Sequence, residues 1–174
     1  MKIRRAIAYF IDWYLITFLM NLLLVAADYM QTGVMTTNVM PITRFQAGEQ
    51  VLLLIILFFL QILYFCVIPK YLLKGQTLGK KLTKIKVVNK DGSEVSFLNL
   101  WKRDILGMIV IEGCFMPLSN YIRNVLMLVI GRSFTQYFIY FSFAAGFVSI
   151  AFLLFDRKGR MLHDFIGSTK VVVV

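Results

Sequence analysis

The stretch RAIAYFIDWYLITFLMNLLLVAA, residues 5–27, decides how the rest of this chain is arranged. A helix that crosses a bilayer needs about twenty mostly apolar residues, and this stretch has that length. The basic residues just before it imitate the start of a signal peptide, but the apolar run exceeds a typical signal core and contains Asp12. The sequence therefore predicts an uncleaved first transmembrane helix over residues 5–27.

Three further apolar runs, at 50–68, 98–118 and 134–155, extend this pattern to a single domain over residues 1–174. The predicted fold class is an all-α membrane protein, a four-helix transmembrane bundle. The run at 98–118 reaches spanning length only if its helix begins near Phe97, with Ser96 as N-cap. The following segment, 120–132, is expected on the outer side, with an amphipathic interfacial helix as one alternative.

The distribution of positive charge predicts the orientation of these helices. Sixteen of the nineteen Lys and Arg residues lie in three places: before or at the start of the first run, between the second and third runs or near the start of the third, and after the fourth. Only Arg44, Arg123 and Arg132 lie on the other side. The positive-inside rule then places both termini and the loop 69–97 in the cytoplasm.

The same charge bears on partners. A net charge of +10 in a soluble chain would suggest nucleic acid, but no nucleic-acid-reading module is visible. We expect the lipid bilayer and anionic lipid headgroups as partners instead, and no nucleic acid. One His and two separated Cys residues, Cys66 and Cys114, predict no metal site, no disulfide and no cofactor. No nucleophile–base arrangement is visible, so we expect no enzyme.

The cytoplasmic loop carries β-strand signals. Residues 83–89 alternate in polarity, Asp91-Gly92 is typical of a hairpin turn, and residues 94–97 can form the returning strand. The C-terminal residues 169–174 are β-branched except for Lys170. They either add a strand to this hairpin or form an exposed C-terminus.

Ionisable residues inside the apolar runs are the candidate functional residues. A carboxylate at the centre of a spanning helix costs about 2.5–3.5 kcal/mol on insertion scales, so Asp12 needs a partner, a proton or water. Arg5 lies seven residues earlier, about 10.5 Å along a helix axis, which is too far for a direct pair. Each side chain is expected to meet partners on other helices or to bridge through water. Two alternatives remain: a structural ion pair and an ion or proton site.

Further charged residues extend this set. Glu112 lies near the middle of the third run, as a proton-binding group or as a neutral hydrogen-bonding side chain. Arg103 and Asp104 lie near the inner interface, where they can join Arg5 and Asp12 in one charged cluster.

Several segments together resemble the RDD family of small bacterial membrane proteins, which is named for one arginine and two aspartates. Arg5 and Asp12 match the arginine and the first aspartate, and the stretch GQTLGKKL at 75–82 resembles the family's loop after the second helix. The ending LHDFIGST at 162–169 resembles its C-terminal signature and assigns the second aspartate to Asp164. Glu112 has no counterpart in this pattern.

The resemblance implies a multi-pass protein of the bacterial cytoplasmic (inner) membrane. For some family members it implies exchange of monovalent cations for protons, and for others an accessory or regulatory subunit of a larger membrane complex. Four helices leave little room for a transport pathway, which a homo-oligomer or a membrane-protein partner could complete. Both functions remain open on the sequence alone.

Overall fold

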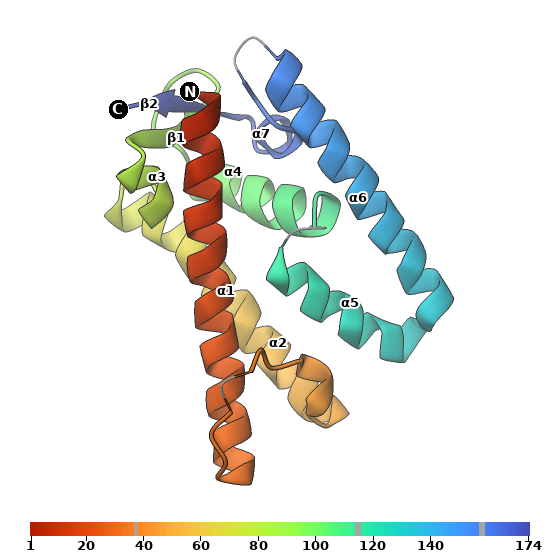
Figure 1. Ribbon diagram of the computed structural model, residues 1–174. Helices are drawn as coiled ribbons and strands as arrows, with labels where there is room; N and C mark the ends of the chain where they lie inside the picture. The colour runs from red at the N-terminus through yellow and green to blue at the C-terminus, as the bar shows by residue number, and fades with distance from the viewer. Residues whose placement is uncertain (37, 114–115, 157–158) are drawn as a thin grey trace.

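The computed structural model describes residues 1–36, 38–113, 116–156 and 159–174 of this chain. It is mostly helical, with one two-stranded sheet (Figure 1). The elements in chain order are α1 (Lys2–Thr32), η1 (Ile42–Arg44), α2 (Ala47–Ile62), η2 (Leu63–Leu72), α3 (Leu78–Leu82), β1 (Ile85–Asn89), α4 (Phe97–Trp101), η3 (Lys102–Ile111), α5 (Pro117–Ile130), α6 (Arg132–Phe155), α7 (Leu162–Ile166) and β2 (Thr169–Val173).

Among the described residues, three helices are long and apolar enough to cross a membrane. They are α1, the continuous helix Ala47–Leu72 formed by α2 and η2, and Thr135–Phe155 of α6. The first two begin before and end after the predicted runs 5–27 and 50–68. A glycine ends α1: Gly33 takes the left-handed conformation, with φ of 69°, and its N–H donates to the carbonyl of Tyr29.

The predicted third span over 98–118 is not one helix. Ser96 caps α4 as expected, by accepting a hydrogen bond from the backbone N–H of Asn99. The helix then continues as the π-helix η3 only to Ile111, and α5 begins separately at Pro117. The α5 helix also covers the segment that we expected as an outer, interfacial one. Proline favours the first turn of a new helix, because its missing N–H would have no partner there.

The second long helix also departs from expectation, because it passes Pro69 and ends at Leu72 instead of at residue 68. Its last ten residues form the π-helix η2, in which the N–H of Leu73 bonds the carbonyl of Ile68, five residues back. This wider turn brings the chain to Gly75, the start of the GQTLGKKL segment.

A single narrow face of α1 is buried. Its buried residues follow one another at intervals of three or four, which places them on one stripe of an α-helix. They are Arg5, Ala8, Asp12, Ile16, Met20, Leu24 and Asp28. The remaining faces carry exposed apolar side chains, as expected where acyl chains surround a helix.

Both termini lie at one end of the molecule, beside the small sheet (Figure 1); we call this the terminal end. Strands β1 and β2 pair antiparallel, from Ile85 opposite Val173 to Asn89 opposite Thr169. The C-terminal segment thus joins β1, as one of the two alternatives predicted. The expected returning strand of the hairpin is reduced to a single bridge between Val88 and Glu94.

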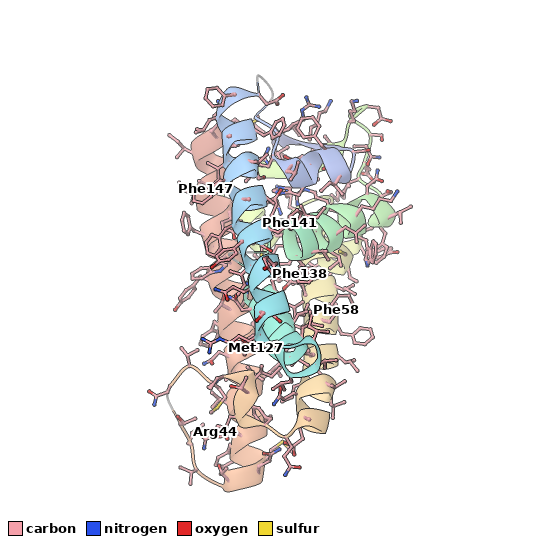
Figure 2. The ribbon with its side chains drawn as sticks, turned by 90° about the vertical axis from the view of Figure 1, so that its right-hand side faces the viewer. Arg44, Phe58, Met127, Phe138, Phe141 and Phe147 are labelled. Atoms are coloured by element: carbon pink, nitrogen blue, oxygen red, sulfur yellow. The ribbon has the colours of Figure 1, made fainter. Side chains whose placement is uncertain are left out.

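The helices α4, η3 and α5 lead the chain in series away from the small sheet, and α6 returns it to the terminal end (Figure 1). The α6 helix packs against α5, η3 and α7. Much of its surface is exposed and aromatic: Phe138, Phe141 and Phe147 are 47%, 57% and 68% exposed (Figure 2).

Candidate functional site

Asp12 is a buried carboxylate whose two oxygens are both occupied. Oδ1 accepts hydrogen bonds from the hydroxyl of Tyr64 at 2.6 Å and the backbone N–H of Gly79 at 2.8 Å. Oδ2 accepts one from the hydroxyl of Thr77 at 2.5 Å. These donors lie on η2 and at the start of α3, so Asp12 ties the segment after the second long helix to the middle of α1.

The close approach of α3 to α1 requires a glycine at position 79. A Cβ atom added there would lie 2.4 Å from the carbonyl oxygen of Ala8 and 2.8 Å from Asp12 Oδ1. Thr77, at the N-cap of α3, also accepts from the backbone N–H of Lys80. Thr77 and Gly79 of the GQTLGKKL stretch therefore serve to dock α3 onto α1.

Lys80 is buried on the same helix but has no close carboxylate. Its Nζ lies 4.0 Å from Asp12 Oδ2, 3.3 Å from Thr77 Oγ1 and 5.8 Å from the ring centre of Phe65. Burial lowers the pKa of this ammonium, and the neighbouring Arg103 lowers it further, whereas Asp12 raises it.

Asp164 is fully buried between two arginines. Its Oδ2 lies 2.6 Å from Arg5 Nη2, and its Oδ1 lies 3.1 Å from Arg103 Nε. Arg5 also donates to the carbonyl of Gly159 at 2.5 Å. Burial alone would raise the pKa of Asp164, but the neighbouring His163, Arg103 and Arg5 outweigh it, so this pKa lies well below its usual value. Arg5 thus pairs with an aspartate near the opposite end of the chain instead of with Asp12.

Arg103 connects this pair to two further groups. Its Nη1 donates to Asp104 Oδ1 at 2.5 Å, and its Nη2 lies 3.1 Å from His163 Nε2. The second oxygen of Asp104 is buried and has no hydrogen-bond partner in the described part of the chain. Since α7 packs tightly here, a Cβ atom at Gly167 would lie 2.6 Å from Arg103 Cβ.

Glu112 and His163 form a bonded pair beside this cluster. Glu112 Oε1 accepts from the hydroxyl of Ser149 and from the backbone N–H of His163, both at 2.7 Å, and Oε2 lies 2.9 Å from His163 Nδ1. A guanidinium only donates, so His163 Nε2 accepts from Arg103 and the ring carries its proton on Nδ1. The imidazole is therefore neutral in this arrangement and donates to Glu112.

A cavity of about 670 Å³ adjoins the network. Its walls come from α1, η3, α6 and α7, with single residues from the neighbouring elements. Six ionisable side chains line it: Arg5, Asp12, Lys80, Arg103, Glu112 and His163. Buried charges of both signs thus border a space large enough for water, ions or a small ligand.

Of the sequence-predicted residues, Arg5, Arg103, Asp104 and Asp164 lie in one network of ion pairs, which Glu112 joins through His163. Asp12 forms a separate pair with Lys80, at 4.0 Å, and both residues line the same cavity. Within the described ranges, no group of three or more His, Cys, Asp and Glu side chains could hold a metal ion. Cys66 is buried and free, and Cys114 lies outside the described residues.

The family model for the RDD family matches residues 3–168, which is nearly the whole chain. The chain belongs to the RDD family. Asp12 and Asp164, to which the sequence resemblance assigned the family's two aspartates, each accept hydrogen bonds from distant parts of the chain. Arg5, to which it assigned the arginine, binds Asp164.

A curated relative of this RDD protein carries the name "Uncharacterized protein YxaI" and comes from Bacillus subtilis (strain 168). The two are 29% identical over 175 aligned positions, which cover 97% of this chain and 93% of the relative. No solved structure matches the chain.

Sequence reasoning did not assign roles to Tyr64, Thr77, Lys80 or Ser149, which contact the predicted residues directly. Thr77 and Lys80 lie in the GQTLGKKL stretch that carried the family resemblance, so the resemblance could have indicated them as candidate site residues. Tyr64 lies in the second apolar run, where nothing local to its sequence indicates the carboxylate on α1.

Proposed function

We propose that this protein exchanges protons for small monovalent cations across the membrane, with Glu112 and His163 as the proton-binding pair. The observation that carries the proposal is the position of His163. Its ring lies between Glu112 and Arg103 and lines the cavity. Buried ionisable groups at membrane depth, next to space for water or ions, are the usual components of proton relays.

The charge of the buried network supports this proposal. With a neutral His163, the network holds two positive side chains, Arg5 and Arg103, and three carboxylates, those of Asp104, Asp164 and Glu112. The separate pair of Lys80 and Asp12 is balanced. An unbalanced charge is costly in a medium of low polarity. One additional positive charge, either a proton or a monovalent cation, would neutralise the network.

Proton binding would also change the contacts of Arg103. A proton that binds the lone pair of His163 Nε2 makes this atom a donor facing another donor, Arg103 Nη2. The two positive groups then repel, and Arg103 must turn toward its carboxylates. The unpartnered Asp104 Oδ2 is an available acceptor for a displaced guanidinium or for a cation.

The separate helices η3 and α5 favour transport as well. In many transporters, discontinuous helices meet near the substrate site, where irregular backbone borders a cavity. Glu112 lies at the C-cap of η3, and Arg123 and Ser119 of α5 donate to the carbonyls of Gly113 and Ile109. The Glu112 carboxylate thus lies where η3 ends, and side chains of α5 donate hydrogen bonds to the backbone carbonyls there.

Proton flux in proteoliposomes tests this function. We expect wild-type protein to move protons in response to an imposed gradient of one among Na⁺, K⁺ and Li⁺. Glu112→Gln should abolish this flux, because the amide cannot take up the charge that balances the network. Glu94→Gln makes the same chemical change at an exposed loop position and should keep wild-type flux.

Two results would contradict the proposal. The first is equal flux in Glu112→Gln and in the wild type. The second is no flux from well-folded wild-type protein with any of these cations and with either direction of the pH gradient.

A second candidate function is a non-enzymatic accessory or regulatory subunit of a larger membrane complex. The complete pairing of Asp12 and Asp164 favours it, since all four carboxylate oxygens already have protein donors. Asp12→Asn separates the candidates. Loss of a folded, monodisperse protein would support a structural carboxylate. Normal folding with lost flux would support transport.

A further inference from the structure

The cavity reaches the surface between α1 and α6. Phe10 of α1 and Ile150 of α6 both line it, and they are 65% and 40% exposed. Leu153 of α6 and Trp13 of α1 add further apolar side chains to its walls. Since α1 and α6 are two of the three helices able to cross a membrane, this opening faces acyl chains.

The inner wall of the cavity carries charged side chains, and these differ in how many hydrogen bonds and ion pairs they make. Arg5 and Arg103 both bond Asp164, and Asp12 accepts three hydrogen bonds. Lys80 differs from them. An ammonium has three donors, and within the described chain Lys80 makes one hydrogen bond from Nζ, to Thr77 at 3.3 Å.

Lys80 therefore holds unused donors in a place that water reaches poorly. Lys80 is only 8% exposed, and burial and Arg103 both lower the pKa of its ammonium group. A negatively charged acceptor in the cavity would offset this desolvation and use the remaining donors.

We propose that the cavity binds one anionic phospholipid, with an acyl chain entering between α1 and α6 and the phosphate accepting hydrogen bonds from Lys80. The inference goes beyond the proposed exchange of ions, because lipid binding needs no flux. The predicted orientation places the terminal end in the cytoplasm, so the lipid would come from the inner leaflet, where anionic headgroups attract basic side chains.

The size of the cavity favours a lipid over a helix of a partner protein. A helix with its side chains is about 10 Å across, so 670 Å³ would hold roughly 8 Å of it, less than two turns. Pockets of roughly 300–1,000 Å³ are typical for small ligands, and an acyl chain with its phosphate falls in this class.

Thermal unfolding of the full chain in detergent, with added dioleoylphosphatidylglycerol, tests the site. We expect this lipid to raise the unfolding temperature of the wild type with a saturable dependence on concentration. Lys80→Met should weaken the apparent affinity about tenfold, because one charge-assisted contact is lost. Lys81→Met is the matched control: it removes the same charge from the exposed neighbour and should bind as the wild type does.

A second pair of variants tests the acyl-chain path and does not depend on Lys80. Gly146 lines the cavity, and Ala144, two residues earlier on α6, is exposed and does not. Gly146→Leu should abolish the stabilisation by the lipid, whereas Ala144→Leu should keep it. If Lys80→Met fails to fold, this pair decides the question.

Three outcomes would overturn the proposal. Stabilisation by dioleoylphosphatidylcholine as strong as that by the anionic lipid would remove the role of the charge. Equal stabilisation by glycerol 3-phosphate alone would remove the role of the acyl chain. Binding of the anionic lipid to Gly146→Leu as strong as to the wild type would place the lipid elsewhere; crosslinking between copies through α1 and α6 would then identify a second chain as the occupant.

Discussion

Gly79 shows how one small residue decides the position of a functional carboxylate. The backbone of α3 can approach α1 only because no side chain stands between Gly79 and the carbonyl of Ala8. The approach allows the Gly79 N–H to reach Asp12, which lies 67 residues earlier. The carboxylate and the glycine therefore depend on one another, although neither indicates the other in the sequence.

Gly79→Ala should lower the stability of the protein by about 1–3 kcal/mol, because a Cβ atom 2.4 Å from a backbone oxygen forces the helices apart. The measurement is the unfolding temperature in detergent. Gly48→Ala is the control, since an added Cβ there meets nothing within 4 Å. Equal unfolding temperatures for the two variants would show that α3 does not pack on α1 as described.

His163 shows how the proton position on one ring follows from its neighbours. Arg103 can only donate, so the lone pair faces Arg103 and the proton faces Glu112. Sequence reasoning considered His163 only together with the adjacent Asp164. Its actual partner, Glu112, lies 51 residues away, and only packing of α7 against η3 brings the two together.

The strand β2 illustrates how an element at the chain end completes a structure that cannot stand alone. A two-stranded hairpin is marginal in water, and here the return strand after β1 is only one bridge. The C-terminal strand supplies the missing partner, with Val171 buried opposite Val87. The β-branched composition of residues 169–174 left two alternatives, a strand added to the hairpin or an exposed C-terminus, and the structure shows the strand paired with β1.

Val171→Lys should therefore lower stability by at least about 2 kcal/mol and expose β1, because Lys replaces a buried apolar side chain. Val173 lies on the same strand and is 52% exposed, so Val173→Lys should have little effect. Unfolding temperature and amide hydrogen exchange of residues 85–89 measure both variants. If neither variant shows faster amide exchange in residues 85–89, the result would contradict the pairing of β1 with β2.

The path of the whole chain follows from the position of its ends. Three helices that each cross the membrane once would leave the two termini at opposite ends of the molecule. Both termini instead lie at the same end, beside the small sheet (Figure 1). We therefore predict that the series α4, η3 and α5 supplies a fourth passage, made in two pieces.

Cysteine labelling tests this path in intact bacterial cells, with Cys66 and Cys114 replaced by Ala. Met35→Cys, after the end of α1, and Ser133→Cys, at the start of α6, change exposed residues and should react with a membrane-impermeant maleimide. Glu94→Cys at the terminal end should react only after the cells are permeabilised. Reaction of Ser133→Cys only after permeabilisation would mean that α4, η3 and α5 do not together cross the membrane.

Hydropathy and charge are local properties, and for that reason the sequence by itself predicted the apolar helices, the basic end and the ionisable residues worth examining. The cap at Ser96 followed from local chemistry in the same way. Local chemistry did not predict the split of the third run or the continuation of the second helix beyond Pro69. Both depend on packing that supplies new hydrogen-bond partners to backbone groups. Tertiary structure alone determined which charges meet: Arg5 and Asp164 are 159 residues apart. A buried charge needs a partner brought to it by packing that excludes water from both groups, and no local pattern records which groups will meet.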